Sequence, residues 1–126
     1  MAQPGSIQTQ RFELMVAEIA KSRNIVWKLL GSRSNLAGTA YGALTDAQEL
    51  CHTLYSDLFS AVDWISAGER CRHLLDVLGK ARSALAELAE EQRDAETALQ
   101  QVRFAHALLL KLAGEIAPDE TFDEET

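Results

Sequence analysis

Long apolar runs are absent from this sequence, and proline is scarce. Only 2 of the 126 residues are proline, and no stretch approaches the roughly 18 uninterrupted apolar residues of a membrane-spanning helix. The first twelve residues also lack the basic segment and apolar stretch of a secretory signal. With 2 cysteines and no such signal, we expect reduced thiols, a cytoplasmic protein and no membrane binding.

Basic charge is also in short supply. The chain has 12 Lys and Arg against 19 Asp and Glu, for a net charge of −7. Nucleic-acid binding depends on clustered basic residues, so we expect no nucleic-acid partner. Residues 115–126 hold six carboxylates and no base, which predicts a disordered acidic tail that aids solubility or folds onto a basic helix face. Residues 1–114 are then a single helical-bundle domain.

The apolar residues recur with a helical period from about Ser6 to Ala113, and no segment alternates as a strand does. This pattern predicts an all-α fold, an antiparallel helical bundle of three to four helices with a long C-terminal amphipathic helix. The first helix is expected over residues 6–31, bounded by Ser6 and Gly31.

The middle of the chain is less regular. Residues 35–45 are small and include Gly38 and Gly42. A connector is the favoured interpretation because glycine disfavours a helix by about 1 kcal/mol relative to alanine. A helical segment in which the glycines admit a close neighbour is the alternative. A firm helix is expected from Thr45 to Ser66, followed by a turn at Ala67 and Gly68.

A heptad pattern follows Gly68. Its a and d positions are, in order, Cys71, Leu74, Leu78, Ala81, Leu85, Leu88, Gln92, Ala95, Leu99, Val102, His106 and Leu109. The unbroken register favours one long helix over residues 69–113 whose second half packs against another copy. In the alternative, the chain bends near residues 91–94, Asp94 caps a new helix, and a four-helix bundle closes.

Residue types that carry chemistry are few. Glu49 and His52 have one Glu-x-x-His spacing, whereas di-iron bundles pair two such motifs with further glutamates. A turn at residues 67 and 68 would also hold His52 and Cys51 about 15 Å along the axis from His73 and Cys71, too far apart for one metal site or a disulfide. No phosphate-binding loop or nucleophile elbow is present. We therefore predict no enzyme activity, no metal site and no cofactor.

Several large apolar side chains fall at the margins of the apolar stripes, where Trp and Tyr serve as interface anchors. This placement favours a non-enzymatic protein-binding module, such as a chaperone, adaptor or anti-activator, that binds another protein and forms a homodimer. A bundle that binds a metal or small cofactor through Glu49, His52, Cys71, His73 or His106 is the alternative. The predicted partner or self-interface residues are Trp27, Tyr55, Phe59, Trp64, Leu85, Leu88, Leu99, Val102, His106 and Leu109.

Overall fold

The protein is a bundle of four α-helices in the computed structural model, which describes residues 6–31, 35–57 and 64–116. The helices are α1 (Ser6–Leu29), α2 (Asn35–Tyr55), α3 (Trp64–Leu88) and α4 (Asp94–Ile116). No strand occurs among the described residues, which confirms the all-α prediction. Among these helices, none is both long and apolar enough to cross a membrane.

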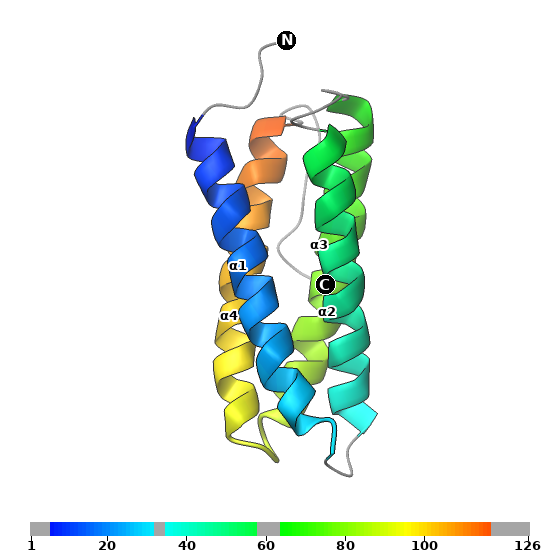
Figure 1. Cartoon of the computed structure of the whole chain (residues 1–126), viewed down its shortest axis with the longest axis vertical. Coiled ribbons are helices and arrows are strands. Elements are labelled where there is room, and N and C mark those ends of the chain that lie inside the picture. Colours follow the sequence, from blue (N-terminus) through cyan, green and yellow to red (C-terminus); the bar gives the residue numbers. More distant parts are fainter. Residues whose placement is uncertain (1–5, 32–34, 58–63, 117–126) are drawn as a thin grey trace.

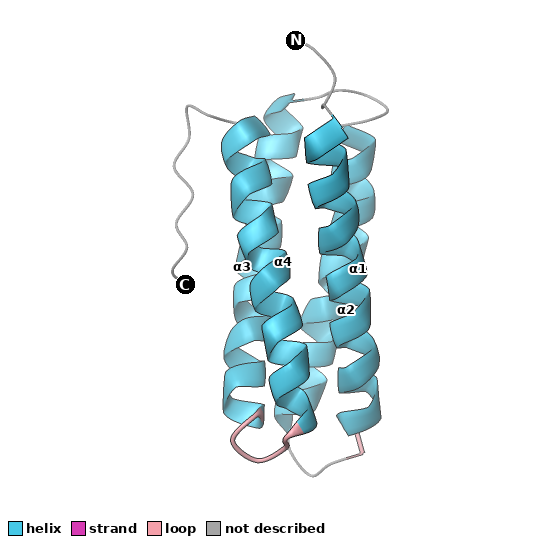
Figure 2. Cartoon of the chain, turned by 90° about the vertical axis from the view of Figure 1, so that its left-hand side faces the viewer, coloured by secondary structure: helices cyan, strands magenta, loops and turns pink. Residues whose placement is uncertain are grey.

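Each helix packs against two others and runs antiparallel to both. The packed pairs are α1 with α2, α2 with α3, α3 with α4, and α4 with α1, so the four helices form a closed ring of neighbours. Figure 1 shows them running along the long axis of the bundle. A quarter turn shows the chain reversing between α3 and α4 at the lower end of the bundle (Figure 2). This is the up-down-up-down arrangement expected when short connections join amphipathic helices.

Periodic apolar residues account for the core. Leu74, Leu78 and Leu85 of α3 and Val102 and Leu109 of α4 are all fully buried, and they occupy the a and d positions of the heptad pattern. Their spacing of three and four residues lines one face of each helix. The sequence period therefore identified the buried faces of α3 and α4.

The prediction of a connector over residues 35–45 was wrong. These residues form the first half of α2. Ala37, Ala40 and Leu44 are fully buried there, and this tertiary packing outweighs the helix-forming cost of Gly38 and Gly42.

The predicted helix from Thr45 to Ser66 was also misplaced. α2 ends at Tyr55, a π-helical turn follows at Ser56 and Asp57, and α3 has begun by Trp64. Ala67 and Gly68 therefore lie inside α3, where both are buried, and they form no turn. Asp57 joins the two helices, since its Oδ2 accepts a hydrogen bond from Nε of Arg70 at 3.3 Å.

The favoured single helix over residues 69–113 does not form. α3 ends at Leu88, whose carbonyl accepts from the amides of Glu91 and Gln92 at 3.0 and 2.8 Å, and α4 begins at Asp94. The alternative of a bend near residues 91–94 is correct. Folding back lets both halves of the heptad pattern bury their apolar faces within one chain, whereas a straight helix would leave half of that surface in water.

The boundary of the acidic tail also differs from the predicted one. α4 continues through Glu115 to Ile116, and Glu115 forms an ion pair with Arg11 of α1. The remainder of the predicted tail, residues 117–126, lies outside the described residues.

Candidate functional site

An open groove lies between α1 and α2, toward the end of the bundle where α1 begins. It has a volume of about 560 Å³, within the range of roughly 300–1,000 Å³ typical of ligand pockets. Its lining residues are Phe12, Val16, Ile19, Thr45, Gln48, Glu49, Cys51, His52 and Tyr55. Among the packed helix pairs, α1 and α2 contact each other least, which leaves room for this groove.

The two walls of the groove differ in chemistry. α1 contributes Phe12, Val16 and Ile19, which are all apolar. The wall from α2 carries polar groups, among them Glu49 and His52. A bound group would therefore meet an apolar surface on one side and hydrogen-bonding groups on the other.

An aromatic pair lies at one end of the groove. The rings of Phe12 and Tyr55 are 5.8 Å apart between centroids and inclined at 46°, within the range of favourable aromatic contacts. Phe12 is buried, whereas Tyr55 is 49% exposed. About half of Tyr55 is therefore accessible to solvent beside the opening.

Cys51 lies in the floor of the groove as a buried free thiol. Burial raises the pKa of this thiol from 9.0 to about 12, because a thiolate loses its hydration in an apolar environment. At neutral pH Cys51 therefore stays protonated and acts as a small apolar residue.

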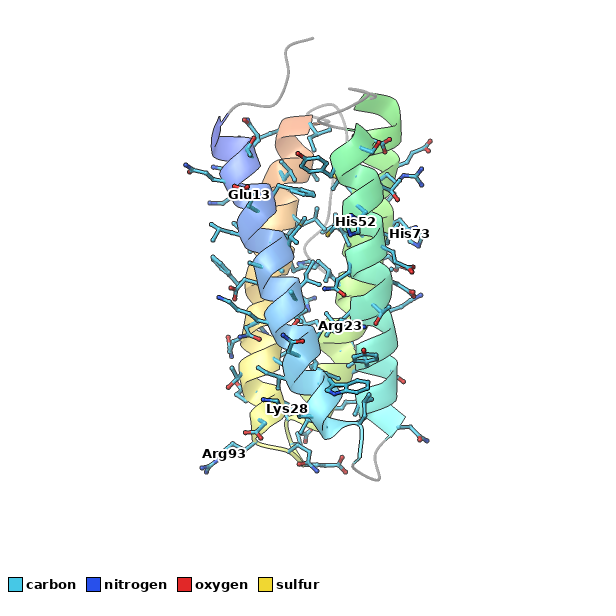
Figure 3. The ribbon with its side chains drawn as sticks, in the orientation of Figure 1. Glu13, Arg23, Lys28, His52, His73 and Arg93 are labelled. Carbon is cyan, nitrogen blue, oxygen red and sulfur yellow. The ribbon has the colours of Figure 1, made fainter. Side chains whose placement is uncertain are left out.

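A polar cluster follows the groove along the same seam (Figure 3). Arg23 of α1 donates to the hydroxyl of Thr45 at 3.0 Å and to that of Tyr41 at 2.6 Å. Its Cζ also lies 4.6 Å from the centre of the Tyr41 ring, a favourable cation–π distance. These partners are all uncharged, so the half-buried guanidinium keeps its positive charge available to an anionic group.

Trp27 stands at the far end of the seam. Its ring packs against Tyr41 with centroids 5.5 Å apart, yet 61% of the residue is exposed. On α2, Gly38 and Gly42 lie three residues before and one residue after Tyr41 and are exposed, and a β-carbon built on either would meet no atom within 4 Å outside its own stretch of helix. We call the surface formed by Trp27, Arg23, Tyr41, the two glycines and the groove the α1–α2 face.

The predicted interface residues fall into three groups. Trp27 and Tyr55 lie exposed on the α1–α2 face. Phe59 lies outside the residues that the structure describes. Trp64 is the first residue of α3, but the structure does not describe its side chain. The other six are buried in the core of a single chain and present no free surface there: Leu85, Leu88, Leu99, Val102, His106 and Leu109.

The residues weighed as metal ligands do not gather. Among residues 6–31, 35–57 and 64–116, no group of three or more His, Cys, Asp and Glu is placed to hold a metal ion. His52 lies beside the groove, whereas His73 is exposed on the outer side of α3 (Figure 3). Because α2 ends at Tyr55 and α3 has begun by Trp64, the axial offset inferred from a turn at residues 67 and 68 does not apply.

The sequence did not identify Phe12, Val16, Arg23 or Tyr41 as site residues. The apolar stripe of the first helix includes Phe12 and Val16, but a stripe does not show which members a neighbouring helix leaves uncovered. In comparisons with models of protein families, curated proteins and solved structures, nothing matched the chain.

Proposed function

We propose that the protein is a non-enzymatic protein-binding module that acts through the α1–α2 face. The observation that carries the proposal is an open apolar groove on the same face as a tryptophan that is 61% exposed. Exposed aromatic residues beside a hollow apolar surface are typical of protein interfaces, where Trp and Tyr act as anchors.

The shape of the groove favours a helical segment as the bound element. The groove runs between two antiparallel helices, and an amphipathic helix fits such a seam with apolar side chains repeated every three or four residues. Arg23 lies next along the seam, and its partners among the described residues are uncharged. A partner helix with an Asp or Glu one turn beyond its apolar side chains would pair with it.

These properties suit a chaperone, adaptor or anti-activator. Both cysteines are free thiols, which is typical of a reducing compartment, so we propose that the protein works in the cytoplasm. The net charge of −7 also favours a protein partner over nucleic acid or an anionic membrane.

Site-specific photocrosslinking tests the proposal. A benzoylphenylalanine placed at Gln48, which lines the groove, should crosslink another protein in cells that make this chain. The matched control is Gln100, which is exposed on α4, a helix that does not contribute to the α1–α2 face. Adducts formed only from position 48, and mapped to an apolar helical segment, would support the proposal. Equal adducts from both positions, or none from position 48, would contradict it.

A small amphiphilic ligand is the second candidate for the same groove, because Glu49 and His52 line it together with apolar residues and its volume suits a small molecule. Native mass spectrometry of untagged protein would distinguish this case. A retained non-protein mass that is lost when Val16 is replaced by Glu would support the ligand, and a bare chain would exclude a tightly bound one.

A further inference from the structure

We infer that two copies of the chain pair through their α1–α2 faces, with Trp27 of each copy inserted into the groove of the other. This dimer goes beyond the proposed function because it states what covers the face when no other protein is bound. It uses the same face, but its existence requires no partner protein.

The contacts along the seam fix the order of features on the face. Phe12 lies beside Tyr55 at the groove end, Arg23 lies beside Thr45 in between, and Trp27 lies beside Tyr41 at the far end. The levels of Phe12 and Trp27 are about 22 Å apart at 1.5 Å per residue. One end of the face is therefore hollow, and the other end carries a projecting ring.

A two-fold axis converts this asymmetry into complementarity. An axis that lies in the plane of the face, perpendicular to the helices and midway between the two ends, turns the second copy upside down. α1 then lies antiparallel to α1 of the other copy, and the hollow end of each face meets the projecting end of its mate. The same contact forms twice, as the isologous interface of a two-fold dimer requires.

Gly38 and Gly42 of one copy offer space for the Tyr55 ring of the other. The rotation brings Tyr55, which is 49% exposed, to the level of Gly38 and Gly42 in the other copy. These helical positions have open space where a β-carbon would stand, so a tyrosine ring can lie flat against the backbone. In a lone chain each glycine costs the helix about 1 kcal/mol relative to alanine, with no packing partner among the described residues to offset it.

Charge supports the same pairing. Along the helix axis, the rotation brings Arg23 of one copy opposite Val16 of the other. Val16 lines the groove together with Glu49. Because Arg23 contacts Thr45 and the two helices are antiparallel, Glu49 lies within about one helical turn of Val16 along the bundle axis. The Arg23 guanidinium, whose described partners are uncharged, would thus come within reach of a carboxylate in the other copy.

The size of the face predicts a weak dimer. Two helices side by side over about 30 Å offer roughly 1,000 Å² in total for both copies, which is at the lower limit for specific interfaces. We therefore expect a weak dimer, in which a partner helix can replace the second copy.

Sedimentation equilibrium of the purified chain tests the dimer. The wild type should shift from 13.9 kDa toward twice that mass as its concentration rises. Trp27→Ala removes the projecting ring and Val16→Glu charges the groove, and each should weaken the dimer at least tenfold. Phe104→Ala is the matched control, because Phe104 is also an exposed aromatic residue, at 48%, but lies on α4. This variant should dimerise as the wild type does.

A mixture of the two weakened variants adds a test that only a reciprocal interface passes. Trp27→Ala alone has two intact grooves and no ring to fill them, and Val16→Glu alone has two rings and no usable groove. Their mixture restores one of the two contacts, so it should associate more tightly than either variant alone.

A charge exchange gives an independent readout. Arg23→Glu and Glu49→Arg should each weaken the dimer, and the double variant should regain affinity because each copy again offers opposite charges. Circular dichroism melts of all variants show whether the bundle remains folded. A wild type that stays monomeric to about 1 mM, a dimer indifferent to Trp27→Ala and Val16→Glu, or a double variant no tighter than the single ones would overturn the inference.

Two outcomes distinguish the dimer from the binding of another protein. A monomeric wild type whose position 48 still crosslinks another protein would overturn the dimer alone. A dimer that behaves as described, with no other protein crosslinked in cells, would overturn the proposed function alone.

Discussion

Arg23 contacts Tyr41 in two ways. Its guanidinium donates a hydrogen bond to the Tyr41 hydroxyl at 2.6 Å, and its Cζ lies 4.6 Å from the centre of the same ring. Because Arg23 belongs to α1 and Tyr41 to α2, the contact joins the two helices beside the groove. It also holds a cation on the α1–α2 face without neutralising its charge.

Replacing Tyr41 separates the two contacts. Tyr41→Phe removes the hydroxyl and keeps the ring, so the free energy of unfolding should fall by about 1 kcal/mol. Tyr41→Ala also removes the ring surface that contacts Arg23 and Trp27, and the loss should reach about 2–3 kcal/mol. Urea unfolding measures both values. Equal losses in the two variants would show that the ring contributes nothing to the seam.

Replacing Gly38 or Gly42 by alanine should raise the stability of the folded chain and lower the affinity of the dimer. Alanine at position 38 or 42 meets no atom within 4 Å of its β-carbon outside its own stretch of helix, so each substitution should stabilise the folded chain by about 0.5–1 kcal/mol. If Tyr55 of a second copy rests on this backbone, the same substitutions should weaken the dimer. Denaturant melts of dilute protein and sedimentation of concentrated protein report these two effects separately. Destabilisation of the dilute chain would mean that α2 bends at these glycines.

The two halves of α2 show what sequence patterns can and cannot predict. From Thr45 onward the apolar spacing and helix-forming residues agree, and the helix was expected there. From Asn35 to Leu44 the glycines argue locally against a helix, and only the burial of Ala37 and Ala40 against neighbouring helices decides the outcome. That burial depends on tertiary contacts, which a propensity does not contain.

The heptad pattern did not determine whether the chain breaks between α3 and α4. The heptad pattern identified Leu85 and Leu99 as apolar positions that need covering, and both are buried, but within one chain and not in the predicted interface with a partner. The same pattern serves a straight helix packed on a second copy and two helices folded back within one chain. The choice between them depends on the charged connection at residues 89–93, where a bend leaves few apolar groups in water.

Leu99→Glu tests the intramolecular role of this helix. Leu99 is 3% exposed within one chain, so a carboxylate there loses both apolar packing and hydration, and the free energy of unfolding should fall by more than about 4 kcal/mol. Leu14→Glu is the control, since Leu14 is 48% exposed and the change should cost less than about 0.5 kcal/mol. Thermal melts followed by circular dichroism measure both. A Leu99→Glu chain that melts like the wild type would place Leu99 on a surface.

The candidate site was less predictable than the core because it depends on convergence. Tyr55 and Trp27 could be selected from the sequence as large residues at the margins of apolar stripes. Arg23 and Val16 became relevant only once α1 and α2 were placed side by side. A helical period reports which face is buried, whereas a groove arises where two helices fail to fill the space between them.

Cys51 should make the stability of the bundle depend on alkaline pH. Burial raises the pKa of its thiol from 9.0 to about 12. Below pH 9 both the folded and the unfolded chain hold the proton, and Cys51 adds no pH dependence. Between pH 9 and 12 the unfolded chain releases the proton while the folded chain retains it, so the free energy of unfolding should fall by about 1 kcal/mol per pH unit from this group.

The matched variant for this effect is Cys51→Ala, which removes the titrating group and leaves Cys71 in place. Its unfolding free energy at pH 8 should be lower than that of the wild type, because the missing sulfur leaves a small cavity. From pH 9 to 11 the difference between the two proteins should shrink, since only the wild type loses stability through Cys51. All other groups are common to the two proteins, so their contributions cancel in the comparison. Urea titrations at several pH values provide the curves, and parallel curves would show that Cys51 is hydrated in the folded chain and that the groove floor is open to water.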